Sequence, residues 1–289
     1  MIPILARTRI GIAAARHTMR GPVVLVPTMG ALHDGHRALL RHGRELAGSS
    51  GSLVVSIFVN PLQFGPDTDL DRYPRTLAGD LAICAEEQVS VVFAPLAAQM
   101  YPSAQTITVD PGPVGQVLEG AFRPGFFAGV LTVVLKIVSL VTPDMAVFGQ
   151  KDAQQAFLIR RMVTELNLGI EIDAVPTVRD PDGLAASSRN GYLSPADRIT
   201  ALALSRALRA GAARAAAGRE AVLAAGRAEL ARATTAEPPL VTDYLELVDQ
   251  ATFGAVPPGY AGPATLLVAG TVGKTRLIDN VPLTLASPS

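Results

Sequence analysis

The feature that most constrains the fold is a regular alternation of apolar runs and helical stretches through roughly the first 175 residues. Runs rich in β-branched residues lie at 23–27, 53–59, 91–94, 145–148 and 170–175, and such continuous runs are typical of strands buried on both faces. Helical patterns lie near 35–47, 76–88, 130–140 and 153–166. This alternation predicts right-handed βαβ units and an α/β fold with a doubly wound, Rossmann-like parallel sheet. Ligands of such sheets bind beyond the carboxyl ends of the strands, so we expect functional loops there.

The sequence pattern changes after Tyr192. Ser194-Pro195 is a typical helix start, and Ala-rich sequence with scattered arginines from Ala196 to Ala233 predicts two exposed helices packed as a hairpin. Segments 244–248, 265–269 and 276–281 then predict a small antiparallel sheet. We therefore expect a larger domain at 1–177 and a smaller α+β domain at 178–289.

Composition limits the classes of partner. Lys plus Arg balance Asp plus Glu at 25 each, which gives no broad basic surface for nucleic acid or an anionic membrane. The single cysteine, Cys84, cannot form an internal disulfide, and its apolar neighbours predict a buried packing residue. The first residues lack the organisation of a signal peptide, and the apolar run 129–141 is too short to span a bilayer. These features predict a soluble cytoplasmic protein.

The loop after the first long apolar run carries the strongest chemical signal. The sequence VVLVPTMGALHDGH, residues 23–36, predicts a strand, a glycine-containing turn and a helix that begins near Gly35. A helix N-terminus offers unpaired N–H groups and a positive dipole end, which suit a phosphate, and His33 and His36 would lie beside it. An incidental surface turn is an alternative. A zinc site is a weaker one, because His33, His36 and His42 lack a good fourth ligand.

Two further loops suit a phosphate-bearing ligand. Lys151 follows the predicted strand 145–148 and would act as a point charge, and Asp152 can cap the next helix. Ser187, Ser188 and Arg189 lie in a turn-rich loop and would form a mobile set of donors for the β- and γ-phosphates. Either loop taken alone is also consistent with an ordinary polar connection.

The segment GTVGKT, residues 270–275, resembles a P-loop but does not match it. The P-loop motif needs a glycine where Val268 stands, and a predicted strand rather than a helix follows Thr275. We interpret the two glycines as part of a β-hairpin turn.

Motifs along nearly the whole chain resemble the pantothenate synthetases, within the nucleotidylyltransferase superfamily. The resemblance is carried by PTMGALHDGH, FVNPLQF, YPRT, LEG, RPGFF, KDAQQ and GLAASSRN, which begin at residues 27, 58, 73, 118, 123, 151 and 183. It implies a pantoate–β-alanine ligase that adenylates pantoate with ATP and Mg²⁺ and then couples it to β-alanine. It also implies a homodimer in which the C-terminal domain is a partial lid.

The resemblance assigns roles residue by residue. It implies catalytic roles for His33, His36, Lys151, Ser187, Ser188 and Arg189. It implies an ATP site made of Pro27, Thr28, Met29, His33, Gly35, His36, Gly149, Lys151, Asp152, Val178, Ser187, Ser188 and Arg189. Pantoate would be bound by Gln63, Gln155, Asn60 and Arg123, and Mg²⁺ by Asp80.

The chain departs from the family pattern at four positions. Relatives often have Glu at 150, an aromatic residue at 153, Met or Leu at 186 and an acidic residue at 79, where this chain has Gln150, Ala153, Ala186 and Gly79. Two other functions remain open at this point: transfer of a nucleotide to a phosphate-bearing acceptor, and non-catalytic sensing of ATP.

Overall fold

The computed structural model describes residues 2–65, 70–71 and 73–286 of the 289-residue chain. Residue contacts divide the chain into two compact units. The first contains Met1–Gly149 and Gln154–Pro176, and the second contains Gln150–Ala153 and Thr177–Ser289. The short turn at Gln150–Ala153 therefore belongs by its contacts to the C-terminal unit, although it directly follows a strand of the first.

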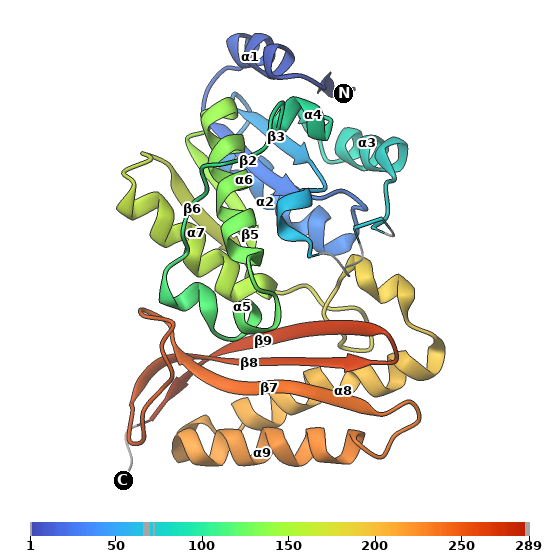
Figure 1. Cartoon of the computed structure of the whole chain (residues 1–289), viewed down its shortest axis with the longest axis vertical. Coiled ribbons are helices and arrows are strands. Elements are labelled where there is room, and N and C mark those ends of the chain that lie inside the picture. Colours follow the sequence, from blue (N-terminus) through green and yellow to red (C-terminus); the bar gives the residue numbers. More distant parts are fainter. Residues whose placement is uncertain (1, 66–69, 72, 287–289) are drawn as a thin grey trace. The chain divides into compact units, whose positions relative to one another are not determined.

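The first unit is built on a six-stranded parallel sheet (Figure 1). Its order is β1-β4-β3-β2-β5-β6, so the order of the strands reverses between β2 and β5. The strands are β1 Ile4–Ala6, β2 Val23–Thr28, β3 Ser52–Ile57, β4 Val91–Phe93, β5 Met145–Gly149 and β6 Glu171–Val175. This sheet, together with the separate antiparallel sheet of the second unit, confirms the predicted fold class.

Both faces of the parallel sheet are covered, which explains the continuous apolar runs. Val23 and Leu25 of β2 enter one hydrophobic core, and Val24 and Val26 enter another; all four are fully buried. Residues of the helices α1 (Arg9–Thr18), α6 (Phe126–Val141) and α7 (Ala153–Glu165) belong to the first core. Residues of α2 (Asp34–Ala47) and α3 (Leu77–Glu86) belong to the second. A strand buried on both faces needs no polar alternation.

Several elements of this unit were not predicted from the sequence. They are β1, α1, α4 (Ala97–Met100), α5 (Glu119–Phe122), and the 3₁₀ helices η1 (Pro61–Gln63) and η2 (Pro113–Gln116). β1 is a three-residue edge strand that pairs only with β4, and its Ile4 and Leu5 are exposed, so it has no buried run to recognise. The helix predicted at 130–140 begins earlier, at Phe126.

The second unit packs a helical hairpin against a three-stranded antiparallel sheet. Its helices are α8 (Pro195–Ala212) and α9 (Gly218–Ala233), with the 3₁₀ helices η3 (Gln150–Asp152), η4 (Ser188–Tyr192) and η5 (Ala215–Ala217). Its strands are β7 (Leu240–Asp249), β8 (Gly262–Val272) and β9 (Thr275–Leu285), in the order β7-β8-β9. The predicted hairpin turn is confirmed at Gly273, whose φ is +57° and across which Val272 pairs with Thr275, whereas Gly270 lies within β8 opposite Leu277.

The helices of this unit approach the sheet at glycines. A Cβ added to Gly211 of α8 would lie 2.6 Å from Cδ2 of Leu266, and one added to Gly226 of α9 would lie 2.7 Å from Cδ2 of Leu245. The helices predicted as exposed therefore bury one face each against β7 and β8. Within the described residues, no helix combines the length and apolar character needed to cross a membrane.

Cys84 is fully buried on α3, as predicted, and burial raises the pKa of its thiol to about 12. Because the thiolate is the reactive form, we expect iodoacetamide to leave the native protein unmodified at pH 8. In denaturant the reagent should add to the chain's one cysteine, which intact-mass measurement would detect. Rapid modification of the native protein would contradict this burial.

Candidate functional site

The histidine loop of the first unit joins β2 to α2 in a fixed conformation. Gly30 has φ +83°, which favours glycine, and a Cβ there would lie 3.0 Å from both Oδ2 of Asp80 and Cγ2 of Ile57, so a side chain would also require these neighbours to shift. Thr28 Oγ1 accepts the Gly30 N–H at 3.2 Å and donates to the Ser56 carbonyl at 2.8 Å. The turn is therefore tied to the ends of β2 and β3.

His33 and His36 cap the N-terminus of α2 with their side chains. Nδ1 of His33 accepts the N–H of Gly35 at 3.1 Å, and Nδ1 of His36 accepts the N–H of His33 at 3.3 Å. The ring centroids lie 4.1 Å apart. Because each Nδ1 is an acceptor, each neutral ring carries its proton on Nε2. The pair thus lies at the first turn of the helix, whose positive dipole end suits an anion.

Asp80 of α3 is buried and accepts hydrogen bonds from the backbone of the same loop. Its Oδ1 accepts the Leu32 N–H at 2.9 Å and the Thr76 hydroxyl at 3.2 Å, and its Oδ2 accepts the Ala31 N–H at 3.2 Å. The residue is 2% exposed. A carboxylate enclosed by three donors has little capacity left for a cation, so this geometry argues against the predicted Mg²⁺ ligand. No group of three His, Cys, Asp or Glu side chains suited to a metal occurs among the described residues.

The predicted pantoate-binding residues gather around η1, which follows β3. Asn60 Nδ2 donates to Gln63 Oε1 and to the Gly129 carbonyl, each at 3.1 Å, and Gln63 Nε2 donates to Met29 Sδ at 3.1 Å. Arg123 lies beside them and donates to the Gln63 carbonyl at 3.4 Å. The structure thus brings Met29, Asn60, Gln63 and Arg123 together from separate segments of the chain.

Asn60 and its partner Tyr101 lie behind this cluster rather than on its surface. Asn60 is 1% exposed, which favours an indirect role through Gln63 over direct contact with a substrate. The Tyr101 hydroxyl donates to Asn60 Oδ1 at 2.8 Å, and burial raises the Tyr101 pKa to about 12. Tyr101 was not identified from the sequence, because nothing in the sequence places residue 101 beside residue 60.

Gln155 and its neighbour Gln154 lie at the start of α7. Gln155 is half-buried, and its contact with pantoate stays a prediction. Gln154 has a structural role: it is 4% exposed and hydrogen-bonds to the backbone of Glu119, Val114 and Val117. Gly149, the last residue of β5, lies at the carboxyl edge of the sheet, as do Pro27 and Thr28 at the end of β2.

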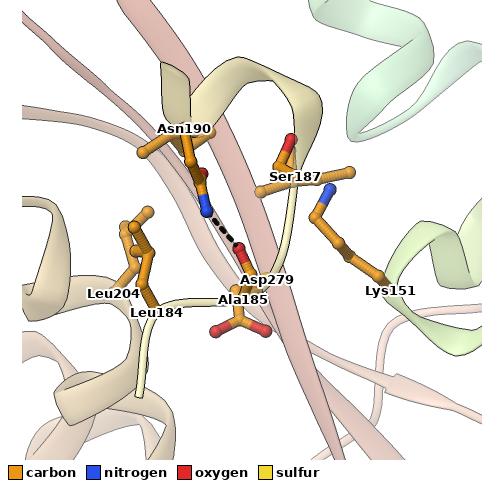
Figure 2. Close-up of a pocket in the computed structure, with 9 residues that line it drawn as sticks. Lys151, Leu184, Ala185, Ser187, Asn190, Leu204 and Asp279 are labelled. Carbon is orange, nitrogen blue, oxygen red and sulfur yellow. Dashed lines mark hydrogen bonds between the residues drawn. The ribbon is translucent and has the colours of Figure 1, made fainter. Parts of the chain in front are cut away.

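In the second unit, Lys151 and Ser187 line one pocket with Asn190 and Asp279 (Figure 2). Ser187 is the N-cap of η4, and its Oγ accepts the Arg189 N–H at 3.3 Å. Asn190 Nδ2 donates to the Ala185 carbonyl at 3.0 Å. The predicted turn-rich loop therefore contains a 3₁₀ turn stabilised by its own side chains, and the mobility of its donors stays a prediction.

A short hairpin leads into that turn. Val178 accepts the N–H of Ala186 at 2.9 Å, and Arg179 forms a bridge with Ala185. Ser188 and Arg189 lie half-buried within η4, and Asp152 is at the end of η3. Each candidate phosphate donor of this unit thus lies on or beside a hydrogen-bonded turn.

This arrangement is that of a nucleotide-binding α/β protein, with ordered loops at the reversal of a parallel sheet and a capped helix N-terminus that suits phosphate. Residues 5–282 match the family model described as pantoate-beta-alanine ligase, and the chain belongs to that family. It is 60% identical to the pantothenate synthetase of Thermobifida fusca, over 98% of this chain and 96% of that one. It is 54% identical to that of Acidothermus cellulolyticus, over 97% and 92%.

Solved structures give the same result. The crystal structure of pantothenate synthetase from Thermus thermophilus matches with a TM-score of 0.88 and 43% identity, over 96% of this chain and 98% of that one. The pantoate-beta-alanine ligase of Francisella tularensis matches with a TM-score of 0.78 and 30% identity, over 96% and 97%. That structure is described as a complex with beta-gamma ATP and beta-alanine.

Ion pairs also connect α2, the helix that the two histidines cap, to the C-terminal end of α3. Glu87 accepts from Arg41 at 2.7 Å and from Arg37 at 2.8 Å. The hydrogen bond from Arg41, with that from Arg37, holds the Glu87 pKa below its usual range, against the opposing effect of burial. A lowered folded pKa stabilises the native state above the unfolded pKa of about 4.3, and this stability is lost as the pH falls through the lower folded value.

We therefore expect Glu87→Gln to lower the melting temperature at pH 7 by a few degrees at most, and the difference from wild type to shrink below about pH 4. Calorimetric melts between pH 3 and 7 would measure this. Glu86→Gln is the matched control, because Glu86 pairs with Arg37 while 62% exposed and should have a smaller effect. A difference that is constant across this pH range would contradict the ion-pair explanation.

Proposed function

We propose that this chain is a pantoate–β-alanine ligase that forms pantothenate, AMP and pyrophosphate from ATP, pantoate and β-alanine. The observation that carries the proposal is the match to the Francisella ligase, described as a complex with beta-gamma ATP and beta-alanine, over nearly the whole of both chains. The capped histidine pair and the pocket with Lys151 and Ser187 support it.

In the proposed reaction a pantoate carboxylate oxygen attacks the α-phosphorus of ATP, and pyrophosphate leaves. The β-alanine amine then attacks the acyl carbon of pantoyl adenylate, and AMP leaves. Neither step needs a nucleophile from the protein, so the catalytic contribution is orientation and stabilisation of charge on the departing groups. We assign that stabilisation to His33, His36, Lys151, Ser187, Ser188 and Arg189.

The other residues of the site position the two substrates. We propose that Gln63, Gln155 and Arg123 bind pantoate, with Asn60 orienting Gln63. Pro27, Thr28, Met29, Gly35, Gly149, Asp152 and Val178 would contact ATP. Homodimer formation and a cytoplasmic location are further parts of the proposal, supported by the family resemblance.

Mg²⁺ enters this proposal as part of the substrate MgATP. Hard Mg²⁺ keeps several waters and is commonly coordinated by substrate phosphates with one or two carboxylates. The Asp80 carboxylate is committed to the Ala31 and Leu32 N–H groups, so we infer that it orients the histidine loop instead.

Asp80→Asn tests this assignment. The new amide N–H group would face a backbone N–H that now donates to the carboxylate, so one hydrogen bond would be replaced by a contact between two donors. An unsatisfied buried polar group costs roughly 1–3 kcal/mol. If that cost displaces the histidine loop and raises the adenylation barrier, the rate constant should fall by about tenfold or more. The Mg²⁺ concentration that gives half the maximal rate should change by less than about twofold. A titration of single-turnover adenylation with Mg²⁺ would measure both quantities.

Thr76→Val is the matched control, because it removes the hydroxyl donor to Asp80 and leaves the backbone donors in place. We expect it to have a small effect on rate. A normal rate for Asp80→Asn at saturating Mg²⁺, with a raised Mg²⁺ requirement, would show that Asp80 is a metal ligand after all.

Isotope labelling tests the route as a whole. Pantoate labelled with ¹⁸O in its carboxylate should give AMP that carries one label, and unlabelled pyrophosphate, because the bridging oxygen leaves with AMP. Mass spectrometry of the nucleotide products would show this. ADP with labelled phosphate would indicate an acyl phosphate instead, and ATP binding without pyrophosphate release would indicate a protein that only senses ATP.

A further inference from the structure

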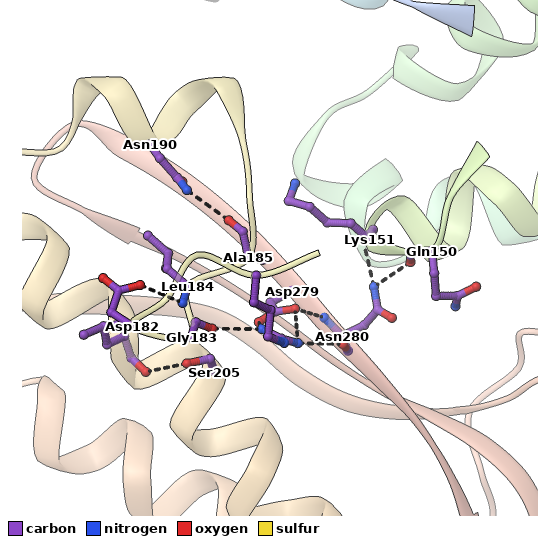
Figure 3. Close-up of polar contacts among 12 residues, drawn as sticks. Gln150, Lys151, Asp182, Gly183, Leu184, Ala185, Asn190, Ser205, Asp279 and Asn280 are labelled. Carbon is purple, nitrogen blue, oxygen red and sulfur yellow. Dashed lines mark hydrogen bonds and ion pairs between the residues drawn. The ribbon is translucent and has the colours of Figure 1, made fainter. Parts of the chain in front are cut away.

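Two consecutive buried residues of β9 connect the candidate phosphate donors of the second unit. Asp279 and Asn280 are 3% and 2% exposed, and neighbouring residues of a strand point to opposite faces. Their side chains therefore reach different segments of the unit (Figure 3). Neither residue was identified as functional from the sequence.

Asn280 holds the turn that carries Lys151. Its Nδ2 donates to the carbonyl of Gln150 at 2.9 Å and to the carbonyl of Lys151 at 2.8 Å. Both partners are acceptors, which fixes the amide with its nitrogen toward the turn. Within the described part of the chain, Asn280 Oδ1 is buried without a hydrogen-bond partner. A buried side-chain amide whose oxygen has no hydrogen-bond partner costs free energy, so filling space alone does not explain an asparagine here.

Asp279 holds the hairpin that leads to Ser187. Its carboxylate accepts two hydrogen bonds from Arg179, at 2.6 and 3.0 Å, and Arg179 also donates to the Gly183 carbonyl at 3.2 Å. Asp279 itself lines the pocket that contains Lys151 and Ser187. One stretch of β9 thus anchors both segments from which the candidate phosphate donors project.

We propose that Asn280 is a positioning residue for Lys151. A lysine side chain is long and flexible, so the place its ammonium group reaches depends on where the backbone of the turn is held. Displacement of a catalytic group by about 1 Å is enough to lower a rate substantially. Asn280 acts through the backbone of η3 and contacts no reacting atom. This inference rests on the proposed role of Lys151 in adenylation.

A double-mutant cycle between Asn280→Ala and Lys151→Ala tests the proposal. We expect Asn280→Ala to lower the single-turnover adenylation rate about tenfold, and Lys151→Ala to lower it by about 10²-fold or more. In the Lys151→Ala background, removal of Asn280 should cost less than about twofold, because the side chain that it positions is absent. The KM for pantoate should be unchanged. If Asn280→Ala does not fold, Asn280→Leu, which keeps a similar volume and lacks both N–H donors without adding a buried charge, takes its place in the cycle.

Asp243→Asn controls for simple loss of stability. Asp243 of β7 pairs with Nε of Arg276 at 2.7 Å in the same sheet and is 13% exposed, so the variant should lower the melting temperature without lowering the rate. An equal loss of rate in both backgrounds would show that Asn280 is only structural and would overturn the proposal. Absence of pyrophosphate release by the wild-type enzyme would instead refute the proposed function, before the cycle is run.

Discussion

The parallel pairing of β2 with β3 on one side and β5 on the other is the constraint on which the site of the first unit depends. Parallel strands end at one edge, so the loops after all three emerge there. Because both faces of β2 are apolar, alternation of side chains cannot fix its register. Polar contacts at its two ends do so: Asp144 Oδ2 accepts the Val23 N–H at 2.7 Å, and Thr28 Oγ1 donates to the Ser56 carbonyl at 2.8 Å. One of these contacts, that of Thr28, lies at the end of β2 from which the histidine loop begins.

Buried polar side chains then fix the loops that the sheet presents. Asp80, Asn60 and Asn280 are each 2% exposed or less. Asp80 and Asn280 bond to the backbone of a segment that carries candidate binding groups, and Asn60 bonds to the Gln63 side chain and to the Gly129 carbonyl. Backbone groups in a buried turn must find partners, and a side chain from another element satisfies them while fixing the turn in space. Groups held in this way need little reorganisation when charge develops on a substrate, which is the condition for strong electrostatic stabilisation.

Local patterns could be predicted from the sequence, whereas contacts between distant residues could not. Periodicity and β-branched runs predicted the central strands, the long helices and the fold class, because these depend on local pattern. The three-residue edge strand β1 lacks such a pattern and was missed. The supporting contacts of Asp80 and Asn280 were not predicted because their partners are backbone atoms far away in sequence: Leu32 is 48 residues from Asp80, and Gln150 is 130 residues from Asn280. An acidic residue seen without that partner suggests a metal ligand, whereas its position between two N–H groups indicates a structural acceptor.

The capping geometry of the histidines also decides where positive charge must come from. Protonation of His33 or His36 at Nδ1 would turn an acceptor into a donor and would break its bond from the Gly35 or His33 N–H. Intact caps therefore require neutral rings, which contribute a dipole rather than a formal charge. In the proposed reaction pyrophosphate leaves as a polyanion, so formal cations are still needed, and Lys151 and Arg189 are the residues to which we assign that role. The hydrogen bonds of Asn280 matter for the proposed reaction because the turn that they hold carries Lys151.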